Sequence, residues 1–168
     1  LYFQKAGDFM TYEQALAAIH SFPRFGGSPG VERVRTFLND LGNPQEGLKY
    51  IHVAGTNGKG STCAILASVL KQAGYRTGLF TSPFISDFCE RIQVDAQLIP
   101  REALISLVEE TLPVAHRLEE SGEALTEFDF TTALGFLWFA RQQCDFVVLE
   151  VGLGGRMDAT NVIGTPLV

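Results

Sequence analysis

A glycine-rich segment with one lysine and several hydroxyl groups carries the clearest chemical signal in this sequence. Residues 55–62 read GTNGKGST and lie between an apolar stretch and a segment with helical spacing of apolar residues. Backbone N–H groups at a helix start bind phosphate, glycines let the backbone approach its oxygens, and a lysine adds positive charge. We therefore predict a phosphate-binding loop whose nucleotide contacts are Asn57, Gly58, Lys59, Gly60, Ser61 and Thr62.

This segment departs from the usual phosphate-loop pattern in two places. The pattern has Ser or Thr directly after the lysine and a further glycine five residues before the second one. Here Gly60 follows Lys59, and Val53 occupies the upstream glycine position. The alternative interpretation is an ordinary turn from a strand into a helix, but the flanking segments favour phosphate binding.

A second signal is an apolar run that ends in an acidic residue. Residues 146–150 read FVVLE, and the glycine-rich sequence VGLGGR follows. In open α/β sheets ligands bind at the carboxyl ends of the strands, where a carboxylate can hold Mg²⁺. Many apolar strands end in a polar residue for no functional reason, so Glu150 becomes a candidate site residue only together with the phosphate loop.

Composition limits the class of protein. The 168 residues correspond to about one domain, are 46% hydrophobic and 19% charged, and carry a net charge of −6. These values argue against a disordered chain, a nucleic-acid partner and a membrane partner. No apolar run reaches the roughly 18 residues of a membrane span, no secretory signal is visible, and the three cysteines are widely spaced. We therefore expect a cytoplasmic protein with reduced thiols.

The spacing of apolar residues predicts alternating strands and helices. Strands are predicted at 48–54, 77–80 and 145–151, a small hairpin or edge excursion at 91–99, and helices at 11–21, 31–41, 62–73, 100–121 and 126–143. Leu66, Val69, Leu70 and Ala73 are expected to form the buried face of their helix, and Pro113 predicts a kink or break in its own. This order predicts an α/β fold of the phosphate-loop type, with a mostly parallel sheet flanked by helices.

Three segments together resemble the folylpolyglutamate synthase/dihydrofolate synthase family of the Mur ligase superfamily. They are GTNGKGS at 55–61, TSPF at 81–84 with ERI at 90–92, and EVGLGGRMDATN at 150–161. The resemblance covers residues 10–168 and implies a Mur-ligase-like central domain with ATP and Mg²⁺ as cofactors. It also implies addition of L-glutamate to a folate or dihydropteroate carboxylate through an acyl phosphate. The glycine after Lys59 favours this branch over the cell-wall ligases.

The resemblance also assigns roles to individual residues. Lys59 and Glu150 would be catalytic, with Lys59 on the ATP phosphates, and Ser61, Ser82 and Glu150 would hold Mg²⁺. The expected substrate contacts are Ser28, Pro29, Gly30, Thr126, Phe128, Asp129, Met157, Asp158 and Ala159. Asp158 suits a pterin because a carboxylate can accept two hydrogen bonds from an amino-pyrimidine edge. Phe128 would stack on the ligand or, equally well, belong to the core.

Both ends of the chain suggest an incomplete domain. Residues 1–9 begin with LYFQ and are interpreted as the remnant of a cleavable purification tag, with Met10 as the natural start. Residues 164–168 read GTPLV, a turn followed by the first apolar residues of a new strand. We expect residues 10–168 to be the N-terminal part of a truncated ATP-binding ligase domain, without the C-terminal domain and inactive alone.

Three functions stay open on the sequence alone. The first is a folate-type ligase, active as a monomer when full length, whose partners are the small molecules folate or dihydropteroate and L-glutamate. The second is another amino-acid ligase of the superfamily, of the cell-wall type. The third is a nucleotide-binding module without ligase chemistry.

Overall fold

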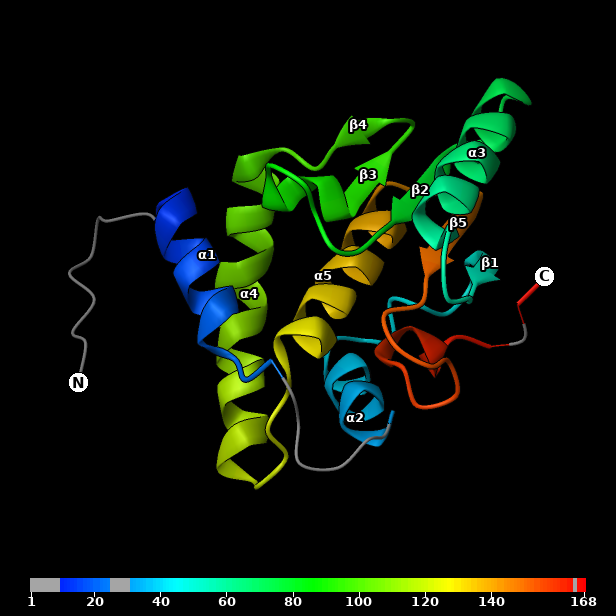
Figure 1. The fold of residues 1–168 in the computed structure, drawn as a ribbon. Coiled ribbons are helices and arrows are strands. Elements are labelled where there is room, and N and C mark those ends of the chain that lie inside the picture. Colours follow the sequence, from blue (N-terminus) through cyan, green and yellow to red (C-terminus); the bar gives the residue numbers. More distant parts are fainter. Residues whose placement is uncertain (1–9, 25–30, 165) are drawn as a thin grey trace.

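The computed structural model describes residues 10–24, 31–164 and 166–168. The predictions for the tag remnant at 1–9 and for Ser28, Pro29 and Gly30 therefore lie outside the described residues. Over the described residues, the strands form a mixed five-stranded sheet in the order β1-β5-β2-β3-β4, with helices on both of its faces (Figure 1).

The part of the sheet next to the phosphate loop is parallel. β1 (Lys49–Val53) and β2 (Thr77–Phe80) both pair in parallel with β5 (Phe146–Glu150). β3 (Ile92–Val94) and β4 (Gln97–Leu98) continue the sheet as an antiparallel hairpin, which confirms the hairpin predicted at 91–99. Val53 is in register with Glu150, so the carboxyl ends of β1 and β5 meet at one edge of the sheet.

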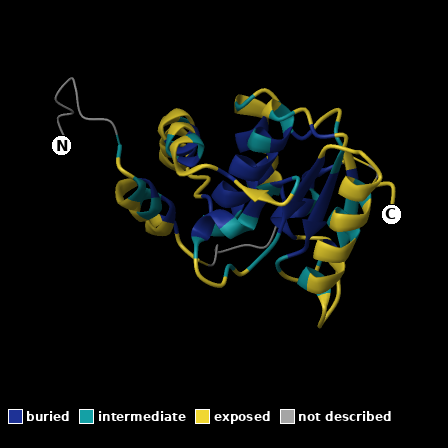
Figure 2. Ribbon diagram, turned by 90° about the horizontal axis from the view of Figure 1, so that it is seen from above, coloured by how far each residue is buried: buried dark blue, intermediate teal, exposed yellow. Residues whose placement is uncertain are grey.

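Four helices lie on one side of this sheet and form the main core together with it. α5 (Glu127–Arg141) is buried along most of its length (Figure 2) and packs against α1 (Tyr12–Ser21), α2 (Glu32–Asp40) and α4 (Arg101–Glu120). Large aromatic side chains from α2, β2 and α5 fill this core. The fully buried ones include Phe37, Phe80, Phe130, Phe136 and Phe139.

The other face of the sheet is covered by α3 (Lys59–Gln72), which differs from its prediction in two ways. The helix begins at Lys59 rather than at residue 62, because Gly58 adopts a left-handed φ of 77° and caps the helix start. Only part of the predicted apolar face is buried: Val69 is 60% exposed and Ala73 is exposed. The spacing of apolar residues identifies the apolar face of a helix, but it does not show how much of that face is buried against the rest of the protein.

Pro113 does not break its helix, contrary to one of the two expected outcomes. α4 continues from Arg101 to Glu120 as a single helix with Pro113 inside it. A proline removes one backbone hydrogen bond, but α4 has buried residues on both sides of it, among them Val108 and Ala115. Packing of these residues offsets the lost bond, since helices in proteins are stabilised mainly by their apolar face.

The described residues also bear on three smaller predictions. Cys63, Cys89 and Cys144 are all free and buried, as expected for reduced thiols. None of the described helices is long and apolar enough to cross a membrane. Leu167 donates a backbone hydrogen bond to Tyr50, and His52 donates one to Val168, so residues 167–168 lie along β1 although they form no assigned strand.

Gly78 of β2 marks a close approach between the sheet and α5. A Cβ atom at this position would lie 2.7 Å from a ring carbon of Phe139. We expect Gly78→Ala to lower the free energy of unfolding by about 1–3 kcal/mol, because an overpacked core must shift side chains or backbone. Chemical denaturation measures this change. Gly164→Ala is the control, because an added Cβ meets no described atom within 4 Å there, and equal losses in both variants would contradict the packing argument.

Candidate functional site

The predicted phosphate loop lies at the carboxyl end of β1 and runs directly into α3. Gly58 turns the chain, and the Nζ atom of Lys59 donates a hydrogen bond to the carbonyl oxygen of Gly55 at 3.1 Å. The first N–H groups of a helix have no acceptor within it, so this end carries partial positive charge. Gly55, Thr56 and Lys59 line a cavity of about 440 Å³ together with residues 151–154.

The other predicted nucleotide contacts occupy the same turn in different ways. Asn57, Ser61 and Thr62 are exposed, and Gly60 lies within the first turn of α3. The Thr62 hydroxyl donates to the carbonyl oxygen of Gly58 at 2.9 Å, so this hydroxyl stabilises the helix start. Ser61 is therefore the better placed of the two hydroxyl residues for binding a ligand.

Glu150 ends β5 directly against this turn. Its carboxylate is buried, and its Oε2 atom accepts a hydrogen bond from the backbone N–H of Ser82 at 2.9 Å. A Cβ atom on Gly60 would lie 3.6 Å from both carboxylate oxygens, so the carboxylate reaches the start of α3. The predicted catalytic and metal-binding residues Lys59, Ser82 and Glu150 thus come together around one helix terminus.

This donor set fits a divalent cation with oxygen ligands. A buried carboxylate is normally paired with a cation, and no basic side chain pairs with Glu150 within the described ranges. The described residues contain no cluster of three or more His, Cys, Asp or Glu side chains that could hold a metal. Mg²⁺ needs no such cluster, because it commonly uses one or two protein carboxylates together with waters and phosphate oxygens.

A second cavity of about 460 Å³ adjoins the first, since Gly152 and Leu153 line both. It brings together residues from the loop after β2, the start of α5 and the segment after β5. The predicted site residues along its wall are Ser82, Thr126, Phe128, Asp129, Met157, Asp158 and Ala159.

Gly152 lets two of these side chains approach the chain closely. A Cβ atom at this position would lie 2.7 Å from Cζ of Phe128 and 3.1 Å from Oδ2 of Asp158. Phe128 also packs edge-on against Phe80, with ring centroids 5.9 Å apart. Both interpretations of Phe128 thus have a place in the structure, because it contacts the core and also lines the cavity.

Thr126 and Asp129 form the N-terminal cap of α5. The Thr126 hydroxyl accepts a hydrogen bond from the backbone N–H of Asp129, and the Asp129 carboxylate accepts one from that of Thr126. The Asp129 carboxylate also forms an ion pair with Nε of Arg33. This reciprocal capping box fixes the start of α5 beside Phe128, so the buried Asp129 has a structural role at the wall of the cavity.

Arg91 is the most prominent wall residue that the sequence analysis did not select. It lines the second cavity and a neighbouring cavity of about 490 Å³, and its guanidinium lies over the rings of Phe84 and Phe88. Its Nε atom is buried and has no hydrogen-bond partner among the described residues, and burial lowers the pKa of the guanidinium. In the sequence, only the presence of Arg91 in ERI at 90–92, one of the segments that carry the family resemblance, could have indicated that it lines a cavity.

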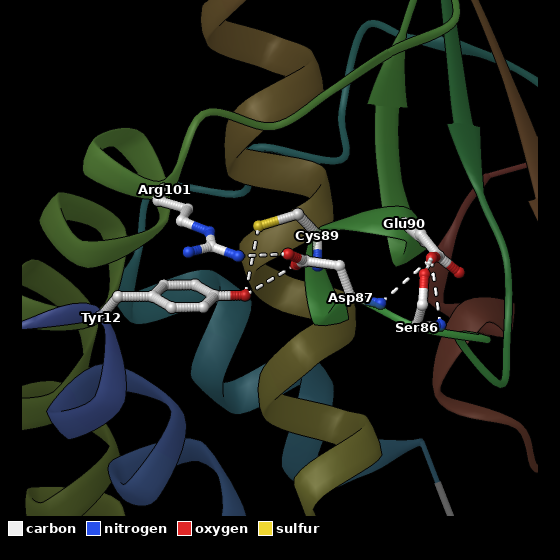
Figure 3. A network of polar contacts seen from close by, with 6 residues as sticks. All are labelled: Tyr12, Ser86, Asp87, Cys89, Glu90 and Arg101. Carbon is white, nitrogen blue, oxygen red and sulfur yellow. Dashed lines mark hydrogen bonds and ion pairs between the residues drawn. The ribbon is translucent and has the colours of Figure 1, made fainter.

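The segment between Ser82 and Arg91 is held by two carboxylates (Figure 3). Glu90 accepts hydrogen bonds from the backbone N–H groups of Ile85, Ser86 and Asp87 and from the Ser86 hydroxyl. Asp87 accepts hydrogen bonds from Tyr12 of α1 and from Arg101 of α4, which both lie on the same side of it. The wall that carries Ser82 and Arg91 is therefore tied to two helices.

The Glu90 network predicts a specific loss of stability in acid. Hydrogen bonds from Ser86 and from neighbouring backbone groups lower the pKa of Glu90 from 4.5 to about 2. Because the folded-state pKa is the lower one, the stabilisation is present above pH 4.5 and is lost as the pH falls toward 2. We expect the melting temperature to fall more steeply in this range for the unmodified protein than for Glu90→Gln, as measured by circular dichroism.

The control for this prediction is Glu120→Gln, at an exposed position at the end of α4. This variant should follow the unmodified protein across the same pH range. If all three proteins lose stability in parallel, Glu90 does not hold the segment in the way described.

Comparisons with known proteins find close relatives of this chain in sequence and in fold. No family model matches the chain. Folylpolyglutamate synthase of Lacticaseibacillus casei is 47% identical over 161 residues, covering 95% of this chain and 37% of that protein. Dihydrofolate synthase/folylpolyglutamate synthase of Bacillus subtilis is 44% identical over 158 residues, covering 92% and 36%.

A solved FPGS–AMPPCP–folate complex superimposes with a TM-score of 0.89 at 46% identity, over 94% of this chain and 39% of that one. The chain thus spans little more than a third of the length of these relatives. With this identity along nearly all of its residues and the same fold, the chain is homologous to the folylpolyglutamate and dihydrofolate synthases.

Proposed function

We propose that this chain carries the nucleotide- and pterin-binding part of an ATP-dependent ligase that joins L-glutamate to a folate. The reaction extends tetrahydrofolate polyglutamates, converts dihydropteroate to dihydrofolate, or does both. The observation that carries this proposal is that the phosphate-loop cavity and the Phe128–Asp158 cavity share the wall formed by Gly152 and Leu153. The names of the relatives and the AMPPCP–folate complex support it.

On the nucleotide side, the proposal assigns the ATP phosphates to the turn at the start of α3. Lys59 provides the cation, Gly58 and Gly60 let the backbone approach the phosphate oxygens, and Asn57, Ser61 and Thr62 complete the turn. A divalent cation would be held by Glu150 with Ser61 and Ser82. When bound, it would neutralise phosphate charge and orient the terminal phosphoryl group.

On the acceptor side, the proposal assigns the pterin to the second cavity. The Asp158 carboxylate accepts a hydrogen bond from an N–H group of the amino-pyrimidine edge, and the Phe128 ring stacks on the pterin. Met157 and Ala159 supply apolar contacts from the segment after β5. Ser28, Pro29 and Gly30 stay predicted contacts of the same ligand.

Glutamate addition requires activation of a carboxylate, which is a poor acyl donor. In the proposed reaction, a carboxylate oxygen of the pteroyl substrate attacks the terminal phosphorus of ATP, the bond to ADP breaks, and an acyl phosphate forms. The amine of glutamate then attacks the acyl carbon, phosphate leaves with that carboxylate oxygen, and the amine proton passes to solvent. Lys59 and Arg91 supply fixed positive charge near the reacting anions, so catalysis is mainly positioning and charge neutralisation.

The test uses the protein encoded by the complete reading frame. ADP release is measured with Mg-ATP and glutamate, in parallel with dihydropteroate, tetrahydrofolate and a uridine-linked muramyl substrate. Release with either pterin supports the proposal, and transfer of ¹⁸O from a labelled substrate carboxylate to phosphate supports the acyl phosphate. Release only with the muramyl substrate, or none at all while Mg-ATP still binds, overturns it.

We further propose that residues 10–168 are part of an ATP-binding domain and that ligation requires more of the protein than this chain. The share of the relatives that the chain covers supports this view. The purified chain should therefore form no glutamylated product. Product above background that depends on both ATP and glutamate would contradict the statement.

A further inference from the structure

His52 of β1 is connected to the second cavity through a buried hydroxyl. Side chains alternate along a strand, and Ile51 and Val53 face α3, so His52 points to the opposite face together with Tyr50. There its Nε2 atom lies 2.7 Å from Oγ1 of Thr160 in the short helix η2 (Ala159–Val162). Thr160 is fully buried, and its hydroxyl in turn contacts the carboxylate of Asp158.

The chemistry of the three groups sets the direction of their hydrogen bonds. An ionised carboxylate only accepts, so the single hydroxyl proton of Thr160 points to Oδ1 of Asp158. The hydroxyl oxygen must then accept from His52, which places a proton on Nε2 of the imidazole. The result is a directed chain that runs from the His52 N–H through the Thr160 hydroxyl to the Asp158 carboxylate.

This chain leaves one carboxylate oxygen of Asp158 available to a ligand. Oδ1 accepts from both the backbone N–H and the hydroxyl of Thr160, whereas Oδ2 accepts from the backbone N–H of Leu153 at 2.7 Å. A carboxylate has about four acceptor sites, two on each oxygen. The remaining site is on Oδ2, the oxygen that lies beside Gly152 at the wall shared by the two cavities.

We propose that His52 and Thr160 are positioning residues that fix Oδ1 of Asp158 and thereby present Oδ2 to an N–H donor of the pterin. The inference rests on the proposed function, because it takes a pterin as the ligand of the second cavity. It narrows the expected two ligand hydrogen bonds on this carboxylate to one, on Oδ2. The proposal also connects β1 to both cavities. His52 of this strand acts on the second cavity through Thr160, and the carboxyl end of the strand leads directly into the loop that lines the first.

Binding of dihydropteroate by the protein from the complete reading frame tests the proposal, with Kd measured by calorimetry. Thr160→Val and His52→Leu should raise this Kd roughly tenfold or more, because each leaves a buried polar group without its partner. Thr160→Ser and His52→Gln keep a hydroxyl or an N–H donor and should restore most of the affinity. The Kd for ATP should change less than about twofold in all four variants, as in the control His116→Leu at an exposed position of α4.

Measurements on the unmodified protein and on Asp158→Asn distinguish the failure of this inference from the failure of the proposed function. If the unmodified protein does not bind dihydropteroate, or if Asp158→Asn binds it equally well, the proposed pterin site fails and the inference fails with it. If Asp158→Asn weakens binding but Thr160→Val and His52→Leu do not, the pterin site stands and the positioning role is overturned.

A measurement on the unmodified protein keeps the proposal testable if the variants do not fold. ¹⁵N nuclear magnetic resonance of the histidine side chains distinguishes the two neutral imidazole forms. The proposal requires that His52 carry a proton on Nε2. A proton on Nδ1 alone would overturn it, because His52 could then not donate to Thr160.

Discussion

Lys59→Ala is expected to reduce the rate of ADP release in the complete protein by at least about 100-fold. Lys59 is the one cationic side chain along the phosphate-loop cavity among the described residues. Its ammonium group uses one hydrogen bond on the carbonyl oxygen of Gly55, so it keeps donors for a phosphate. Steady-state kinetics with Mg-ATP, glutamate and the active pterin substrate measure the loss.

The matched control is Lys71→Ala, which removes the same charge from the last turn of the same helix. This variant should keep its activity within about twofold, since surface charge at that distance is largely screened by salt. Both variants should unfold at nearly the same denaturant concentration as the unmodified protein, because alanine is a good helix former. Equal losses of activity in the two variants would show that Lys59 has no special role.

Gly152→Ala is the second substitution with a large expected effect, because one added methyl group enters the wall between the two cavities. It would lie 2.7 Å from Phe128 and 3.1 Å from the carboxylate of Asp158, so both side chains must move. We expect the Kd for dihydropteroate to rise at least about tenfold, with a loss of about 1–3 kcal/mol in the free energy of unfolding. Calorimetry and chemical denaturation measure these two quantities.

Two comparisons identify the cause of this effect. Gly164→Ala adds the same methyl group where no described atom lies within 4 Å, and it should bind the pterin normally. Adding Phe128→Leu to Gly152→Ala removes the crowded ring and should recover much of the stability, although not the stacking contact. If the double variant is as unstable as the sum of the single ones, the crowding of Phe128 is not the cause.

The sequence predicted the features that depend on local pattern. The strands β1, β2 and β5, the glycine-rich turn into α3 and the acid at the end of β5 each follow from a short run of residues with a defined chemistry. Parallel pairing of such strands brings their carboxyl ends to one edge of the sheet, so the approach of Glu150 to the start of α3 could be anticipated.

The sequence could not predict the features that depend on contacts between distant segments. Arg91 becomes a wall residue only because the loop after β2 folds over α5, and Arg33 joins the site through an ion pair with Asp129. The link between His52 and Thr160 depends on which face of β1 meets η2. The early start of α3 depends on the single backbone angle of Gly58.

The place of β5 in the sheet has a consequence for the order of folding. β5 is the last of the described strands in the sequence, yet it lies between β1 and β2. The antiparallel β2, β3 and β4 can pair as soon as they have been synthesised, whereas β1 must wait for residues 146–150. Closing such long loops is slower than forming a local hairpin. On the ribosome, therefore, the turn at the start of α3 and the walls of the two cavities should come together in one late event, after Glu150 has emerged.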